Sequence, residues 1–421
     1  MTRIKSFQNR CIKWETAMVR SPGSYTKELI FLTLVRLLMN VALRFVYTFL
    51  GPIARGLSVS ERTLGQSTVL LSLSGLVAPA AGRAGDRRGR HRMMSIGVIV
   101  CGLGTLIAGS TSSLLVFALG LGFVGMGVVI LGTSMTAWVG DAVSYERRGF
   151  AIGFTELSWA AALFIGMPLV AIAMNVWSWR APFFIITIAT VPLAARIWLS
   201  HDKDTAHEQP EAEKFQLTHQ AVLLFSAMAI ISVGHQLVIV THGLWLEQNL
   251  GLDVGGLGAV AIPLGIGELI GAASTLVLAD RMGKAKAAIA GLLLATPLAT
   301  LIGPFGDTRL SAILLLAAFL MAFEFGFVSA IPLFTELSSG ARGTALGIVV
   351  MSITVSRAFA TIGGAALFDR FGMTWIGLSA ALTMITGVVL IWRAGDPGVT
   401  RLASQDMGTV LDQATDRGQR E

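Results

Sequence analysis

The sequence is dominated by twelve apolar segments, each long enough to cross a lipid bilayer as a helix. A membrane-spanning helix needs about 20 mostly apolar residues, and lipid admits only helices and closed barrels. A barrel would show segments of about 10 residues with alternating polarity, which the sequence lacks. The sequence therefore predicts an all-α membrane protein with twelve transmembrane helices. The expected spans are 30–51, 64–81, 94–110, 114–137, 151–173, 181–195, 219–244, 255–278, 287–304, 310–334, 345–367 and 374–392.

The charge content excludes several classes of protein. Only 14% of the residues are charged and 54% are apolar, whereas soluble domains are about 25% charged. A soluble enzyme, a disordered chain and a disulfide scaffold are therefore excluded. The sequence contains no Gly-x4-Gly-Lys-Ser/Thr loop and no Cys/His set with metal-ligand spacing. We therefore expect that the protein is not powered by ATP hydrolysis and binds no metal or cofactor. The net charge of +7 is assigned to membrane topology rather than to nucleic-acid binding.

Lysine and arginine residues are distributed unequally between the two sides of the predicted bundle. The tails and the even-numbered loops hold 24 of them, the odd-numbered loops hold 5, and three lie inside spans. Because positive residues are retained on the cytoplasmic side, both termini are predicted to be cytoplasmic. The chain is expected to be a multi-pass protein of the cytoplasmic membrane.

Two short motifs recur at one offset, which indicates an internal duplication. Asp86-Arg87-x-Gly89 returns as Asp280-Arg281-x-Gly283, and Arg148-Gly149 returns as Arg342-Gly343, in both cases 194 residues later. The predicted organisation is a basic tail (1–28), a six-helix half (29–199), a polar cytoplasmic linker (200–218), a second six-helix half (219–394) and a cytoplasmic tail (395–421). The first tail is either a disordered segment or a helix lying in the membrane interface, since its apolar residues recur at spacings of three and four.

The loop after the second span carries a family resemblance. It reads Gly82-x-x-x-Asp86-Arg87-x-Gly89-Arg90. Together with the repeated motif at Asp280, it resembles the signature of the major facilitator superfamily of secondary transporters. The resemblance implies two halves that rock around a central cavity, a small-molecule substrate, and a carboxylate at residue 86 that is held against span 11 in the outward-open state. We expect the arginines of this loop to form ion pairs with acids across the boundary between the two halves. The two glycines are expected to allow close helix approach and a tight turn. The alternative is a loop that only sets topology.

Six charged residues fall inside the predicted spans, and such residues are functional candidates by default. Arg36 and Arg44 lie in span 1, about two helical turns apart, with Asn40 between them. The spacing of four residues puts all three on one face of the helix. A stripe of this kind cannot face lipid, so we assign it to the cavity. Either arginine could bind an anionic group of a substrate, or both could be partners of buried acids.

Glu268 in span 8 and Glu324 in span 10 are the candidate proton carriers. A carboxyl group inside the membrane can take up and release a proton as the site opens to each side. The alternative for each is a permanent ion pair with an intramembrane arginine. His235 in span 7 is placed in the cavity by the same layout, while Glu156 and Arg357 are assigned to a buried network or a cytoplasmic gate.

The function predicted from these features is secondary active transport of a small organic solute by alternating access, coupled to protons, with export favoured. Two other readings stay open at this point. The chain could be a uniporter or anion exchanger that uses Arg36 or Arg44, or a membrane scaffold that transports nothing. In each case it is expected to be a monomer and not an enzyme.

Overall fold

The structure is a computed structural model, and it describes residues 22–143, 145–200, 217–337 and 342–395. The interfacial helix suggested for the first tail, most of the polar linker and most of the last tail lie outside these ranges. Every regular element among the described residues is helical. Within the described ranges eleven helices are long and apolar enough to cross a membrane, which is the all-α membrane architecture that the sequence predicts.

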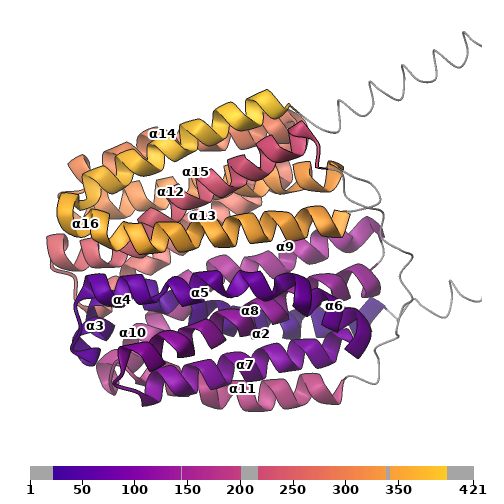
Figure 1. Ribbon diagram of the computed structural model, residues 1–421, viewed down its shortest axis with the longest axis horizontal. Coiled ribbons are helices and arrows are strands. Elements are labelled where there is room, and N and C mark those ends of the chain that lie inside the picture. Colours follow the sequence, from indigo (N-terminus) through magenta and orange to yellow (C-terminus); the bar gives the residue numbers. More distant parts are fainter. Residues whose placement is uncertain (1–21, 144, 201–216, 338–341, 396–421) are drawn as a thin grey trace, which may run out of the picture.

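The helices form an N-terminal set and a C-terminal set, which lie one above the other in Figure 1. The N-terminal set consists of α2 (Pro22–Thr48), α3 (Leu50–Leu57), α4 (Glu61–Ser67), α5 (Val69–Leu73), the 3₁₀ helix η1 (Ser74–Val77), α6 (Ala78–Arg88), α7 (Arg90–Ser110), α8 (Leu114–Ala142), α9 (Tyr145–Ala161), the π-helix η2 (Ala162–Gly166), α10 (Met167–Val176) and α11 (Ala181–Leu199). The C-terminal set consists of α12 (His219–Leu250), α13 (Val254–Met282), α14 (Lys284–Phe305), α15 (Arg309–Glu336) and α16 (Arg342–Ala394).

The last helix is too long to be one span. Its apolar part, Gly347–Ala394, has 48 residues, which would reach about 72 Å at 1.5 Å per residue, more than twice the hydrocarbon thickness of about 30 Å. Gly372 interrupts it with a non-helical backbone, φ 76° and ψ −174°, a conformation that only glycine adopts without strain. The expected spans 345–367 and 374–392 lie on the two sides of this break.

Proline residues divide two other spans into shorter helices. Pro79 has no N–H for the carbonyl of Gly75, and the N–H of Ala78 donates to that carbonyl instead, which produces the 3₁₀ turn η1. Pro168 follows the π-helix η2, where the N–H of Met167 donates to the carbonyls of residues 162 and 163. Such a π-bulge accommodates a proline without breaking the helix.

Glycines bring neighbouring helices into backbone contact. A Cβ atom on Gly97 of α7 would lie 2.8 Å from the carbonyl of Gly127 on α8, and one on Gly127 would lie 2.4 Å from the carbonyl of Gly97. A Cβ on Gly291 of α14 would lie 2.4 Å from the backbone of Gly326 on α15. Close packing of this kind holds helices together in lipid, where burial of apolar surface supplies little driving force.

Glycines mark three of the places where the two sets meet. Gly243 of α12 lies against the backbone of α2, because a Cβ there would be 2.5 Å from the carbonyl of Thr48. Gly265 of α13 packs against η2, and Gly65 of α4 packs against Ala365 of α16. These contacts bring the polar faces of α2 and α13 into the centre of the bundle.

The two repeated loops have matching turns. Gly89 has φ 95° and ψ 145°, and Gly283, which is 194 residues later, has φ 86° and ψ 137°. Both glycines precede a helix and adopt a backbone that disfavours other residues. The tight turn expected at Gly89 is therefore present, and its counterpart at Gly283 has the same shape.

The surroundings of the first loop are described in part. No atom of the described residues lies within 4 Å of a Cβ built on Gly82, so the close helix approach expected there is not found among them. One partner of Arg90 lies in its own set, since its Nε atom is 3.1 Å from a carboxylate oxygen of Asp141 at the end of α8. Arg87 and Arg281 are exposed, and the side chains of Asp86 and Asp280 lie outside what the structure describes.

The glycine contact between α7 and α8 can be tested with a matched pair of substitutions. We expect Gly127→Ala to lower the stability of the purified protein by about 1–3 kcal/mol, because the new methyl group would overlap the backbone of α7. Gly132→Ala is the control, since Gly132 lies on the same helix with no atom within 4 Å of the added Cβ. Thermal unfolding in detergent measures both, and equal melting temperatures would contradict the packing described here.

Candidate functional site

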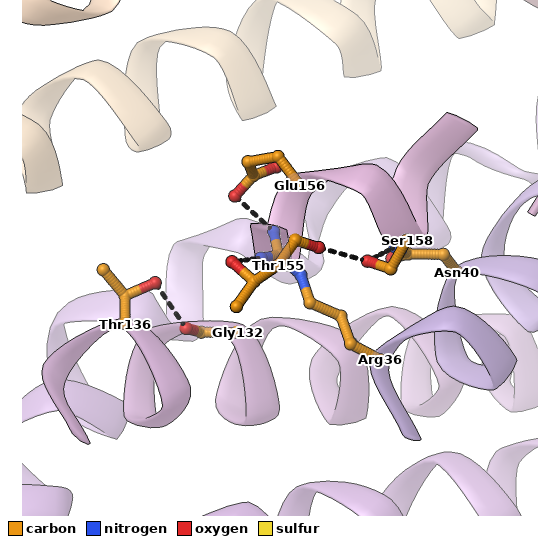
Figure 2. Close-up of polar contacts among 7 residues, drawn as sticks. All are labelled: Arg36, Asn40, Gly132, Thr136, Thr155, Glu156 and Ser158. Atoms are coloured by element: carbon orange, nitrogen blue, oxygen red, sulfur yellow. Dashed lines mark hydrogen bonds and ion pairs between the residues drawn. The ribbon is translucent and has the colours of Figure 1, made fainter. Parts of the chain in front are cut away.

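The polar stripe of α2 is bound to α9 within the N-terminal set. Arg36 donates from Nη1 to Oγ1 of Thr155 at 2.9 Å and forms an ion pair with Glu156 at 2.8 Å. One turn further along α2, Asn40 donates to Oγ of Ser158 at 3.1 Å. Figure 2 shows these side chains converging from the two helices. Because the Glu156 side chain is 51% exposed, this pair borders accessible space rather than a sealed core.

Arg44, two turns beyond Arg36, crosses to the C-terminal set. Its two terminal nitrogens donate to the two carboxylate oxygens of Glu268 on α13, at 2.9 and 2.6 Å. Nη1 also donates to the carbonyl of Trp159 at 3.2 Å, and the guanidinium lies 4.9 Å from the centre of the Trp159 ring. Both charged residues are buried, with 7% and 2% exposure. A two-pronged arginine–carboxylate contact of this kind is both strong and geometrically specific.

Glycines on α13 let Glu268 reach this position. Gly265, one turn before Glu268, packs against η2, while Gly267 packs against the carbonyl of Ala317 on α15. Gly271 packs against Met321 and against Cβ of Glu324 on α15. The small residues therefore bring α13 close to both sets at the same level of the bundle, and they leave room for the two acidic side chains.

Glu324 and Arg357 lie in the same central region without a direct partner. Among the described residues Glu324 forms no hydrogen bond or ion pair, although its charge acts on those of Glu268, Arg44, Arg357 and Glu156. Nε of Arg357 is buried and has no hydrogen-bond partner in the described ranges. Both side chains are partly accessible to solvent. Arg357 was assigned to a network with Glu156, but no contact between these two is found in the part of the chain that the structure describes.

A second chain of polar contacts joins the two sets beside this cluster. The hydroxyl of Tyr47 on α2 lies 3.4 Å from Oγ of Ser72, which lies 3.2 Å from Oγ1 of Thr361 on α16. Thr361 also accepts a hydrogen bond of 3.2 Å from Gln236 on α12. These residues were not predicted to belong to the site, because the prediction relied on charged side chains alone. The signal available was the presence of uncharged polar residues inside apolar spans.

The two central histidines are buried on α12. The ring of His235 stacks on Phe323 at 4.2 Å between ring centres, and its Nδ1 atom has no partner among the described residues. Nδ1 of His242 lies 2.8 Å from the carbonyl of Ile239. His242 is 6% exposed and lines a cavity together with Arg44.

That cavity is small. Its volume of about 20 Å³ accommodates about one water molecule. The residues that line it are Arg44, Tyr47, Thr48, Leu163, Val238, Ile239, His242, Leu264, Leu316 and Leu320. Six of these ten residues are apolar, and the polar ones are Arg44, Tyr47, Thr48 and His242. No group of three or more potential metal ligands occurs among the described residues.

Charged residues also join the two sets at the end predicted to face outside. Arg55 on α3 lies 2.5 Å from a carboxylate oxygen of Glu247 on α12, and Gln248 donates a hydrogen bond to Glu61 on α4. Arg62 on α4 lies 3.8 Å from Asp369 on α16. Trp245, on the same helix two residues before Glu247, is buried, with 3% exposure. These contacts close one end of the bundle.

The fold agrees with comparisons to known proteins. The family model of the Major Facilitator Superfamily matches residues 32–331. The chain belongs to the major facilitator superfamily. Members carry small molecules across membranes, so this chain is a multi-pass membrane transporter and not an enzyme, as the sequence predicts.

The relatives are distant in sequence. Multidrug resistance protein 1 of Bacillus subtilis (strain 168) is 24% identical over 384 residues, which cover 86% of this chain and 97% of that protein. The uncharacterized MFS-type transporter YwfA of the same organism is 32% identical over 108 residues, and the match spans about a quarter (26%) of each chain. Among solved structures, a bacterial homologue of the human lysosomal transporter Spinster, in an inward-facing and occupied conformation, superposes with a TM-score of 0.68 at 16% identity, covering 92% of this chain and 98% of that one.

The pair formed by Arg44 and Glu268 generates a prediction about stability. Arg44→Gln or Glu268→Gln alone leaves an uncompensated buried charge, which should cost about 3–5 kcal/mol of stability. The double variant removes both charges, so we expect it to recover at least half of that loss in a thermal unfolding measurement.

The pair formed by Arg36 and Glu156 serves as the comparison for this cycle. Because Glu156 is half-exposed, neutralising either member should cost less than about 1 kcal/mol. Additive losses in the Arg44–Glu268 cycle, with no recovery in the double variant, would contradict the coupling inferred from the geometry.

Proposed function

We propose that this protein is a proton-coupled secondary transporter that moves a small organic solute across the cytoplasmic membrane by alternating access. In this proposal it is a monomer with twelve membrane-spanning helices in two halves, 29–199 and 219–394, and with both termini in the cytoplasm. The two arms of α16 count as separate spans. The observation that carries the proposal is the buried pair of Arg44 and Glu268, which bridges the two sets beside the unpaired carboxylate of Glu324.

The pair can act as a latch that responds to protons. Rocking of the two sets must break or rotate the contact between α2 and α13. Protonation of Glu268 would remove the charge that holds Arg44, so the helices could then separate at a lower cost. Glu324 lies close enough for its charge to act on Glu268, and a proton on either carboxylate relieves their mutual repulsion. We assign the carried proton to Glu324 and the latch to Glu268.

The contacts at the predicted external end support an outer gate. Arg55, Glu61 and Arg62 come from the N-terminal set, and Glu247, Gln248 and Asp369 come from the C-terminal set. With that end joined, the central cavity of about 20 Å³ is too small for an organic solute. This structure is therefore a state closed to the outside, and the outer contacts must break before the protein can open there.

The direction of transport is proposed to be export. The relative that covers most of this chain is named a multidrug resistance protein, which supports movement outward. Anion exchange through Arg36 or Arg44 has less support, because both guanidinium groups are held by carboxylates. A scaffold without transport has less support as well, since it would gain nothing from keeping six charges inside the membrane.

Neutralising the proposed proton site should uncouple transport. With protein reconstituted into vesicles and a solute chosen by thermal-shift screening, we expect Glu324→Gln to reduce flux driven by an imposed pH gradient at least about tenfold, since a site that carries no proton cannot couple to it. Asp307→Asn is the control, because this acid is exposed in the loop before α15. Full gradient-driven flux in both Glu324→Gln and Glu268→Gln would refute the coupling.

Weakening the outer gate should open the protein toward the outside. We expect Arg55→Gln or Glu247→Gln to speed labelling of a cysteine at Thr48 by a membrane-impermeant maleimide about two- to fivefold, as fits an exposed pair worth about 0.5–1 kcal/mol. Thr48 lines the cavity and is 3% exposed. Cys11 and Cys101 are first replaced by alanine.

Two controls make the gate experiment specific. The charge-reversed double variant Arg55→Glu with Glu247→Arg should restore slow labelling, because it rebuilds the pair with the opposite orientation. Arg309→Gln changes an exposed arginine at the same end of the bundle and should leave the rate unchanged. Equal rates in the single variants and the parent protein would contradict a gating role.

A further inference from the structure

The charges inside the bundle balance in number but not in pairing. Arg36 pairs with Glu156, and Arg44 pairs with Glu268. Glu324 and Arg357 remain, one of each sign, and no ion pair within 4 Å joins them among the described residues. Both lie beside the same turn of α12, because Phe323, next to Glu324, stacks on His235, and Thr361, about one turn from Arg357, accepts a hydrogen bond from Gln236. The centre therefore holds one carboxylate and one guanidinium that are near each other and not in contact.

The position of Arg357 on α16 is well defined by its neighbours. Thr354, almost one turn earlier, lies against Gly75, where an added Cβ would be 1.9 Å from its hydroxyl oxygen. Thr361, about one turn later, is bonded to Ser72 and to Gln236. This face of α16 is therefore turned toward the N-terminal set. The charge of Arg357 acts on Tyr47 and Arg44 of α2 as well as on Glu324 and Glu268.

An unpaired charge in a membrane interior is costly, and a bound ligand can supply its partner. A purely cationic ligand would pair with Glu324 and leave Arg357 uncompensated. A purely anionic ligand would pair with Arg357 and leave Glu324 uncompensated. Only a ligand that carries both signs satisfies both residues and keeps the centre neutral.

We propose that the transported solute is a small zwitterion, whose ammonium group binds Glu324 and whose carboxylate binds Arg357. This inference rests on the proposed transport function and names its class of substrate. The guanidinium of Arg357 suits a carboxylate, since it can donate two parallel hydrogen bonds. The buried Nε atom, which lacks a partner in the described ranges, is one of the donors that such a ligand would engage.

The surroundings favour an apolar substituent on this zwitterion. Leu320, about one turn before Glu324 on α15, lines the small cavity beside Arg44, and Phe323, next to Glu324, stacks on His235. Sites for small organic molecules combine a mostly apolar lining with a few placed polar groups. An amino acid with an apolar side chain has the required chemistry.

This assignment also explains how a proton and the solute could exchange. Glu324 can hold either a proton or the ammonium group, but not both with full strength. Binding of the zwitterion would then displace the proton, and its release would allow the proton to return. Competition at one carboxylate is sufficient to couple the two movements in opposite directions.

The test compares three matched series of ligands on the full-length purified protein. The probes are the apolar natural amino acids, their methyl esters, which are cationic, and their N-acetyl derivatives, which are anionic. In a thermal-shift assay at pH 7 we expect at least one free amino acid to raise the melting temperature, and its ester and its N-acetyl form to bind at least about tenfold more weakly, a difference of about 1.4 kcal/mol. The inference is overturned if no free amino acid stabilises the protein, or if an ester or N-acetyl form matches the best one.

Variants of the two residues separate a binding role from a general loss of structure. Glu324→Gln should weaken binding of the amino acid at least about tenfold and shift the preference toward the N-acetyl form, because only Arg357 remains charged. Arg357→Gln should shift the preference toward the ester. Asp307→Asn and Arg309→Gln, both exposed, should keep the parent preference. An unchanged order of preference in the first two variants contradicts the assignment.

The binding assay needs no proton gradient, so its failure can be told apart from failure of the proposed coupling. Amino acid binding with flux that ignores pH would refute the coupling and leave the zwitterion site standing. Gradient-driven flux of another solute, without stabilisation by any free amino acid, would refute the zwitterion site alone.

Discussion

The buried contact between Arg44 and Glu268 is the interaction on which the rest of the centre depends. A charge inside a membrane protein must find a partner of the opposite sign, and here the two partners come from different sets of helices. Their contact therefore fixes how α2 lies against α13. It also fixes where the cavity beside Arg44 is found, and it places Glu324 among charges from both sets.

The backbone is built to permit this contact. Small residues at Gly265, Gly267 and Gly271 bring α13 against η2 on one side and α15 on the other. The π-helix η2 follows directly after α9, which holds the partners of Arg36 and Arg44. A Cβ atom on Gly265 would lie 2.7 Å from the backbone nitrogen of Phe164 in η2, so a side chain there would push α13 away from the N-terminal set. The charged centre and the glycine pattern are therefore one structural feature.

The fold and the charged residues of the site were predictable from sequence, while the pairing was not. Apolar length, loop charge and the repeated Asp-Arg-x-Gly motif are local signals, and they are sufficient for a helical membrane transporter of this family. Which carboxylate meets Arg44 depends on how α2 and α13 rotate about their axes, and no local pattern encodes that rotation. The outer contacts of Arg55 and Glu247 were missed for the same reason, because residues near the ends of spans look alike whether they face lipid, water or another helix.

Any rocking of the two sets must separate Arg44 from Glu268, and the structure offers Arg44 other contacts within its own set. Arg44 already contacts the carbonyl and the ring of Trp159, both of which belong to the N-terminal set. Breaking the contact therefore leaves the Arg44 charge partly compensated. Leaving one buried charge unpaired costs about 3–5 kcal/mol. Alternative contacts of this kind lower the free energy needed to break the ion pair, so the contact can open.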